Sequence, residues 1–345
     1  DNEVSNLRKM CDEIFGEENF IATICWQKFH SVKSNAEHNV SQSHDFILCY
    51  AKIAVGLDFK KLPMSDKALE VYKNLDNDSR GRWRTAPLTV SLLTGSRGES
   101  YKRTGKSTGL YPIIAPNGKE HYPSAGRCWI AKDSVGRLRE DNRIWWGKDG
   151  NATPMQKIFL DEKGGVKSIS TFWKHEEFGS NKKANEELKL LFSDNDDDTE
   201  NFPTPKPTLL IKTMVGMVAE EDSIILDFFA GSGTVGHSTA LHNVEKNTKC
   251  KYLLVQLPES ISSGKYKTIA EISKERIRRA GAKIKEENPE YEGDLGFKVF
   301  KLDSTNIKPW EVDFDMTERT LEDFISNIKP DRREEDVLYE ILLKY

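Results

Sequence analysis

Residues 223–243 restrict the fold of this chain more than any other stretch. They read SIILDFFAGSGTVGHSTALHN: an apolar run ends on an acid, a glycine-rich turn follows, and a helical pattern begins after it. A strand, a tight glycine loop and a helix in this order form a ligand site at the carboxyl end of a parallel sheet. The stretch therefore predicts an α/β fold with a binding site at the loop.

The region around this loop alternates between strand and helix patterns. Strands that alternate with helices of about ten residues or more imply a parallel sheet with crossover helices. A helix is expected to begin directly after Gly233. We also predict strands over residues 223–227, 252–257 and 297–302, and helices over residues 208–218, 266–285, 317–328 and 332–343.

The N-terminal and middle parts of the chain show other patterns. Residues 4–15 carry apolar side chains on one helical face, and residues 20–27 and 45–51 are apolar runs typical of neighbouring buried strands. After residue 61 the pattern breaks into short segments with frequent Gly, Pro and Arg. We therefore divide the chain into residues 1–60, 61–200, 201–310 and 311–345, which are a helix with a strand pair, an irregular module, the glycine-loop region and a C-terminal helical segment.

The composition excludes several classes of protein. The chain is 37% apolar and 31% charged, which is typical of a globular protein. No apolar run approaches the roughly 18 residues of a membrane-spanning helix, and the polar opening DNEVSNLRK is not a signal peptide. Single cysteines in odd number argue against a disulfide framework and a structural zinc; they are Cys11, Cys25, Cys49, Cys128 and Cys250. We expect a cytoplasmic protein that needs no metal and contacts no membrane.

The acid before the glycine loop helps to identify the ligand. Gly231, Gly233 and Gly236 fit the G-x-G-x-x-G dinucleotide pattern, and Glu259 stands near the spacing of a ribose-binding acid. Asp227, however, would face the anionic pyrophosphate of a dinucleotide. S-adenosylmethionine (AdoMet) has no phosphate, so the acid can pair with its amine while loop N–H groups receive its carboxylate. The loop suits AdoMet better; an NAD-dependent oxidoreductase and a turn that binds no ligand remain the alternatives.

Several stretches resemble one enzyme family. DFFAGSGT resembles the AdoMet-binding motif of amino-DNA methyltransferases, and FPTPKPTLLIKTMV resembles the helix that precedes it in their beta arrangement. The segments LRKMCDEIFGEENFIATICWQK, HDFILCYAK, GRCWIAKDSVGRLREDNRIWWGKDG, STFW and YLLVQLPE are similar to modification (Mod) subunits of type III restriction-modification systems. The resemblance implies a DNA (adenine-N6) methyltransferase with a Rossmann-like doubly wound sheet, incomplete in this chain. It also implies a homodimer of modification subunits and a helicase-nuclease restriction subunit as partner.

The resemblance also assigns the cofactor-binding residues. Gln256 and Glu259 stand near the ribose position, and for Gln256 a polar strand end is the alternative interpretation. The loop and the preceding helix would hold the methionine part of AdoMet; the residues are Asp227, Phe228, Gly231, Ser232, Gly233 and Thr234 from the loop, with Lys206 and Pro207 from the helix start.

The irregular module corresponds in position to the target-recognition insertion of Mod subunits. Residues 81–150 contain thirteen Lys or Arg but only six Asp or Glu, although the whole chain has a net charge of −4. Such cations would neutralise DNA phosphates, and some arginines could read guanine edges in the major groove. The candidates for contacts with double-stranded DNA are Arg97, Lys102, Arg103, Lys106, Arg127 and Lys148, and for each a solvated surface cation is the alternative.

The catalytic motif of this family is absent from the sequence. The family positions the target amine with Asp/Asn-Pro-Pro-Tyr/Phe, which also stacks on a flipped base. The thirteen prolines of this chain include no adjacent pair, so we name no catalytic residue. His44 and Asp45 are left out of the catalytic set because such a His is more commonly structural. We expect the chain to be a fragment that starts downstream of the motif; a non-catalytic DNA-binding module is a further alternative.

Overall fold

The computed structural model describes residues 3–31, 40–192, 204–261, 265–308 and 327–344 of the chain, except the side chains of Arg97 and Lys163. The chain divides into two compact units, Asp1–Asp294 and Leu295–Tyr345. Both helices and strands are present, and the strands form several small sheets of two or three strands each. The predicted mixed α/β class is therefore confirmed. None of the helices in the described part is long and apolar enough to cross a membrane.

The first unit begins with a helix and a three-stranded sheet. Helix α1 (Val4–Phe15) and strand β1 (Phe20–Gln27) have the predicted bounds, and β2 (His44–Tyr50) differs from its prediction by one residue at each end. β1 pairs antiparallel with β2 and parallel with β12 (Phe172–Trp173). The sheet thus combines the N-terminus with a segment about 150 residues later in the sequence.

A tryptophan-rich core connects this sheet to the glycine-loop region. The indole rings of Trp26 and Trp173 are 1% and 0% exposed. Trp173 stacks on Phe178 of α6 (His175–Phe178) with ring centroids 4.3 Å apart. Leu210 and Met217 of helix α8 (Thr208–Val218) pack into the same core. The start of α8 is therefore held against the N-terminal sheet.

The middle of the chain forms short strand pairs and helices, as its irregular pattern predicts. Its central sheet joins β4 (Trp83–Pro87), β10 (Met155–Phe159) and β9 (Ile144–Trp145). Lys157 of β10 is 1% exposed and pairs with Asp76 and Asp78 beneath this sheet. The other elements are η1 (Glu17–Asn19), β3 (Leu62–Pro63), α2 (Asp66–Leu69), β5 (Thr89–Ser91), α3 (Gly95–Thr104), β6 (Ile113–Ile114), β7 (Glu120–His121), β8 (Arg127–Trp129), α4 (Lys132–Glu140), α5 (Leu160–Lys163), β11 (Val166–Lys167) and α7 (Asn181–Leu191).

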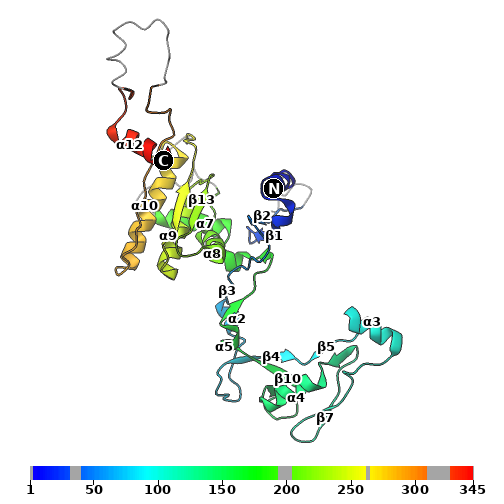
Figure 1. Cartoon of the computed structure of the whole chain (residues 1–345). Coiled ribbons are helices and arrows are strands. Elements are labelled where there is room, and N and C mark those ends of the chain that lie inside the picture. The colour runs from blue at the N-terminus through cyan, green and yellow to red at the C-terminus, as the bar shows by residue number, and fades with distance from the viewer. Residues whose placement is uncertain (1–2, 32–39, 193–203, 262–264, 309–326, 345) are drawn as a thin grey trace, which may run out of the picture. The chain divides into compact units, whose positions relative to one another are not determined.

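The glycine-loop region contains the strand, loop and helix that its sequence predicts. Strand β13 (Ile224–Asp227) pairs in parallel with β14 (Lys251–Leu254), and α9 (Thr234–Lys246) connects them as a crossover helix. Helices α8 and α10 (Ile269–Glu287) both contact α9, as Figure 1 shows. α8 has the predicted bounds, while β14 and α10 begin and end within a few residues of theirs. This packing positions the loop between β13 and α9.

The second unit differs from the prediction in one element. Its helix α12 (Glu334–Lys344) is close to the predicted helix over residues 332–343. The predicted strand over residues 297–302 is wrong, because these residues have no regular secondary structure. An isolated strand needs a partner for its backbone groups, and here Phe300 instead packs on Tyr339 of α12 with ring centroids 5.1 Å apart. The predicted helix over residues 317–328 lies outside the described residues, apart from its last two positions.

Candidate functional site

The loop between β13 and α9 needs glycine at two positions. Gly231 and Gly233 have φ angles of +52° and +76°, a region that favours glycine. A Cβ atom on Gly233 would also lie 2.6 Å from Oγ and 3.0 Å from the backbone oxygen of Ser273 on α10. The loop thus packs closely against α10 at Gly233, which leaves no room there for a side chain.

The loop connects an acid at the end of β13 to the N-terminus of α9. Asp227 is half-buried at the end of β13, and its Oδ1 accepts a hydrogen bond of 3.1 Å from the backbone N–H of Phe229. Gly233 is the N-cap of α9, and no side chain caps this helix end. The first N–H groups of a helix carry partial positive charge and attract anions. The geometry therefore suits a ligand that carries both an ammonium and a carboxylate.

Aromatic side chains lie next to the acid. Phe228 and Phe229 are 62% and 82% exposed, and Leu226 of the preceding strand β13 is 59% exposed. Their ring centroids are 5.1 Å apart. Exposed rings of this kind offer a face for stacking on a planar ligand.

The two predicted ribose-binding residues occupy different surroundings. Gln256 follows β14, and its Oε1 accepts a hydrogen bond of 2.7 Å from the N–H of Gly231, so it holds the loop from the neighbouring strand. Glu259 is exposed and is joined to α10 through its backbone oxygen, which accepts from the N–H of Ile269 at 3.1 Å. The structure brings Gln256 to the loop, whereas it records no contact between the loop and Glu259.

An ion-pair bridge connects the loop region to the N-terminal sheet. Nζ of Lys206, just before α8, lies 2.9 Å from Oδ2 of Asp45. Nζ of Lys28, the residue after β1, lies 2.6 Å from Oδ1 of the same carboxylate. Burial acts to raise the pKa of Asp45, but the two lysines hold it below its usual value. Pro207 is buried next to Lys206. Asp45 and Lys28 are not among the predicted site residues, since nothing in a single sequence signals that Lys206 pairs with an acid 161 residues before it.

The hydroxyl groups of the loop face a buried arginine that the sequence analysis also missed. Ser232 and Thr234 are 2% and 6% exposed, and both accept hydrogen bonds from Nη1 of Arg276, at 2.8 Å and 2.7 Å. The Thr234 hydroxyl also donates to the backbone oxygen of Lys206 at 3.3 Å. Burial lowers the pKa of Arg276 to about 10, which leaves it charged at neutral pH. Six predicted residues therefore meet in one place: Lys206, Gly231, Ser232, Gly233, Thr234 and Gln256.

His237, on the first turn of α9, should destabilise the protein in acid. Burial, assisted by Arg276 and Lys283, lowers the pKa of His237 to about 3. The unfolded chain takes up a proton near pH 6.5 and the folded chain only near pH 3, so the free energy of unfolding falls as pH decreases through this window. Between pH 7 and pH 5, the free energy of unfolding of His237→Gln should fall by about 2 kcal/mol less than that of the unsubstituted chain. Urea unfolding at the two pH values measures this difference.

The exposed His30 supplies the control for this prediction. His30→Gln should show the same loss between the two pH values as the unsubstituted chain. Equal losses in the His237 and His30 variants would contradict the assignment of the acid sensitivity to His237.

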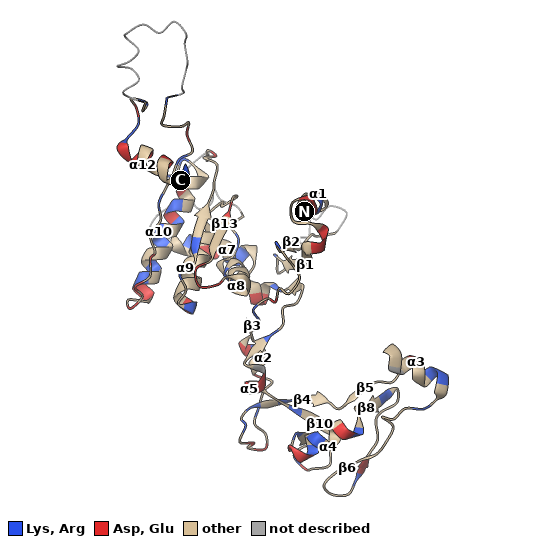
Figure 2. Cartoon of the chain, viewed as in Figure 1, with Lys and Arg blue, Asp and Glu red and all other residues tan. Residues whose placement is uncertain are grey.

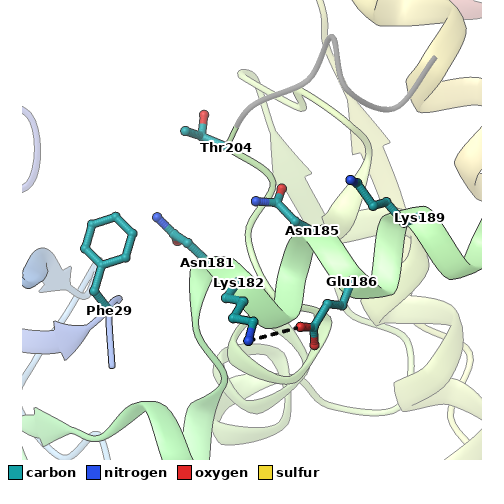
Figure 3. Close-up of a pocket in the computed structure, with 7 residues that line it drawn as sticks. All are labelled: Phe29, Asn181, Lys182, Asn185, Glu186, Lys189 and Thr204. Atoms are coloured by element: carbon teal, nitrogen blue, oxygen red, sulfur yellow. Dashed lines mark ion pairs between the residues drawn. The ribbon is translucent and has the colours of Figure 1, made fainter. Parts of the chain in front are cut away.

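A hollow lies beside the segment that leads to Lys206 (Figure 3). Its volume is about 570 Å³, and it is open to solvent. Lys182 and Glu186 form an ion pair of 3.8 Å along its edge. Its lining combines one aromatic ring with amide, charged and hydroxyl groups from Phe29, Asn181, Lys182, Asn185, Glu186, Lys189 and Thr204. It is separate from the loop residues described above, and none of the predicted site residues lines it.

The predicted DNA contacts lie on different elements of the irregular module. Lys102 and Arg103 occupy the last turn of α3, and Lys106 follows it; all three are exposed (Figure 2). Lys148 is exposed in a turn after β9. Arg127 of β8 donates to Oγ1 and to the backbone oxygen of Thr89 at 2.7 Å and 2.8 Å, so part of its guanidinium braces the β5–β8 pair. Arg97 lies on α3, but its side chain is outside the described part.

Comparison with known proteins agrees with the motifs of the sequence. The model of the DNA methylase family matches residues 1–280. The chain is 35% identical over 311 residues to the Mod subunit of the type III restriction-modification enzyme StyLTI from Salmonella typhimurium, with 88% of this chain and 44% of the relative covered. It is 27% identical over 335 residues to the EcoP15I Mod subunit of Escherichia coli, with 87% of this chain and 48% of that subunit covered. The similarity to type III Mod subunits that the motifs indicate is therefore confirmed.

A type II enzyme is similar as well. The methyltransferase M.KpnI of Klebsiella pneumoniae is 25% identical over 274 residues, which covers 74% of this chain and 60% of the relative. The chain spans about half the length of the Mod subunits that it matches. Within the described residues, no three His, Cys, Asp or Glu side chains are grouped in a way that could hold a metal ion.

Proposed function

The chain belongs to the DNA methylase family, and we propose that it is the cofactor-binding and target-recognition part of a type III modification methyltransferase that methylates adenine N6. The observation that carries the proposal is one loop that begins after Asp227 at the end of β13 and ends at the N-terminus of α9, which no side chain caps. In the same proposal, β13 and β14 are strands of a Rossmann-like doubly wound sheet. Residues 1–60, 61–200, 201–310 and 311–345 are then a catalytic-subdomain part, the target-recognition module, the AdoMet subdomain and a C-terminal helical segment.

The fit between AdoMet and the loop rests on charge. Asp227 would pair with the methionyl ammonium, and the first N–H groups of α9 would receive the carboxylate. Phe228 would contact the ligand with its exposed ring, while Gln256 and Glu259 would approach the ribose. When bound, AdoMet supplies a methyl group that its sulfonium already activates. The remaining contribution of these residues is to hold the ligand in one orientation.

A calorimetric titration with AdoMet and, separately, with NADH tests this assignment. We expect heat of binding with AdoMet and none with NADH, since Asp227 would repel a pyrophosphate at the loop. Binding of NADH in place of AdoMet would contradict the proposal and favour an NAD-dependent oxidoreductase. One relative is named a type II methyltransferase and another a Mod subunit of a restriction-modification enzyme, which supports the first outcome.

The basic end of α3 is the most direct candidate for DNA contact. Replacing Lys102, Arg103 and Lys106 together by Gln should weaken binding to a duplex by about tenfold at moderate salt. The slope of log affinity against log salt should decrease by about 2 to 3, because each cation at a phosphate accounts for about 0.9. Fluorescence anisotropy with a labelled duplex, repeated over a range of salt concentrations, measures both quantities.

The matched control removes the same charge elsewhere. Lys246, Lys249 and Lys251 are exposed at the amino end of β14, opposite the glycine loop. Their replacement by Gln should leave the salt slope unchanged. A smaller slope in the control, or an unchanged slope in the α3 variant, would contradict the assignment of DNA binding to α3.

The proposed partners follow from the same family. The similar proteins from Salmonella typhimurium and Escherichia coli are named as Mod subunits, which supports double-stranded DNA as substrate and a place in a larger assembly. We propose a homodimer of modification subunits that joins a helicase-nuclease restriction subunit. A protein that modifies bacterial DNA acts in the cytoplasm, and we propose that compartment.

A further inference from the structure

Arg276 is a buried cation directly behind the glycine loop. It lies on α10, its relative exposure is 0%, and its Nη1 donates to the hydroxyls of Ser232 and Thr234. Both acceptors are neutral. The guanidinium charge is therefore held in place by the loop but is not neutralised by it.

The charge has no close acidic partner among the described residues. No described carboxylate lies within 4.0 Å of the guanidinium. Glu187 of α7, the acid that acts on Arg276 electrostatically, uses its Oε2 to accept from the N–H and the hydroxyl of Thr208, at 3.0 Å and 2.7 Å. The Nε and Nη2 atoms of Arg276 are buried without a hydrogen-bond partner. Burying a charge in this state costs several kcal/mol, so the position is expected to serve a purpose other than stability.

The charge of Arg276 raises the electrostatic potential at the loop. A charge in a poorly polarisable interior acts over a longer distance than one in water. Ser232 and Thr234 are the residues through which Arg276 touches the loop, and Thr234 begins α9, whose N–H groups carry partial positive charge. The buried guanidinium and the helix end therefore add to the same positive potential at the ligand side of the loop.

We propose that Arg276 is a positioning residue that selects ligands with an anionic group at the glycine loop, and that in AdoMet this group is the methionyl carboxylate. The inference rests on the proposed cofactor site and extends it to a residue 44 positions beyond Ser232. Arg276 touches no ligand in this arrangement; it acts through the hydroxyls that it binds. Asp227 would select the ammonium and Arg276 the carboxylate, so the two ends of the methionine would be recognised by opposite charges on opposite sides of the loop.

The test compares two ligands that differ in that carboxylate alone: AdoMet and decarboxylated AdoMet. The 345-residue chain is titrated with each by calorimetry, as the unsubstituted protein, as Arg276→Met and as Arg276→Lys. Arg276→Met should weaken AdoMet binding by about tenfold, from a Coulomb interaction at an effective dielectric constant of about 20, and should change the affinity for decarboxylated AdoMet by less than about twofold. Arg276→Lys keeps the charge and should keep most of the preference for AdoMet.

Arg278 provides the matched control on the same helix. Its side chain is 57% exposed, and it pairs with Glu275 at 3.3 Å. Arg278→Met removes the same charge and should leave both affinities unchanged. Circular dichroism shows whether each variant is folded; if Arg276→Met is not, Arg276→Gln, which keeps a polar group but loses the charge, takes its place with the same expectation.

Three outcomes would overturn the inference. A loss of equal size for the two ligands means that Arg276 merely supports the fold of the loop. An unchanged affinity for AdoMet in Arg276→Met means that its charge does not reach the ligand. If the unsubstituted chain binds neither ligand, the proposed cofactor site fails first and this inference fails with it, so the two failures are told apart by the unsubstituted protein.

Discussion

Asp227→Asn should weaken AdoMet binding by about 10- to 100-fold. The substitution keeps the shape of the side chain and an oxygen that can accept from the N–H of Phe229, so the turn is expected to persist. What is lost is the negative charge, and a hydrogen bond to a charged group contributes about 1.5–3 kcal/mol. The amide would also present an NH₂ group to the ligand's ammonium in one of its orientations. Calorimetric titration of the variant beside the unsubstituted chain measures the effect.

Asp222 supplies the control for this substitution. It precedes β13, is exposed, and Asp222→Asn changes the charge of the chain by the same amount. Its affinity for AdoMet should equal that of the unsubstituted chain. An Asp227→Asn variant that binds AdoMet as tightly as the control would contradict the pairing of the acid with the ammonium and, with it, the argument that selects AdoMet over a dinucleotide.

Trp173→Ala should lower the free energy of unfolding by about 3–5 kcal/mol, which is the usual cost of removing a large buried aromatic side chain. Trp173 is 0% exposed, stacks on Phe178 and donates through Nε1 to the backbone oxygen of Ser170 at 2.7 Å. Its ring belongs to the core that holds α8 against the N-terminal sheet. Urea unfolding followed by tryptophan fluorescence and circular dichroism gives the difference.

The neighbouring residue makes the comparison specific. Phe172 is in the same strand and 52% exposed, and Phe172→Ala should cost about 1 kcal/mol or less. Equal losses at the two positions would mean that the core described around Trp173 does not carry the stability of this unit. Trp173→Ala should also disturb the position of Lys206, because the same core packs against α8, which begins two residues later at Thr208.

Local elements were predictable where the pattern is long and its neighbours are close in sequence. α1, β1 and α8 have the predicted bounds for two reasons. Their apolar residues recur with the period of a helix or a strand, and residues that typically begin or end such elements flank them. The apolar residues at 297–302 suggested a strand, but such residues form a strand only where another strand is available to pair with it. The short strand β12 has two residues and offers no pattern at all.

Local sequence is sufficient to predict the strand, the glycine loop and the helix between Ile224 and Lys246, together with the acid at the strand end. These features depend on residues next to one another, and glycine at positive φ has few substitutes. The family similarity followed from the same motifs. The proposed choice of AdoMet also needed nothing beyond the charge of Asp227.

The distant side chains that support this loop can be identified only in the folded chain. The bridge from Lys206 to Asp45 spans 161 residues, and the contact from Arg276 to Ser232 spans 44. A lysine before a helix, an aspartate in a strand and an arginine in an amphipathic helix have the same local sequence pattern whether they face solvent or a binding loop. Whether such a side chain faces solvent or the loop depends on how α8 and α10 pack against α9. Packing between distant segments leaves no local signal in the chain.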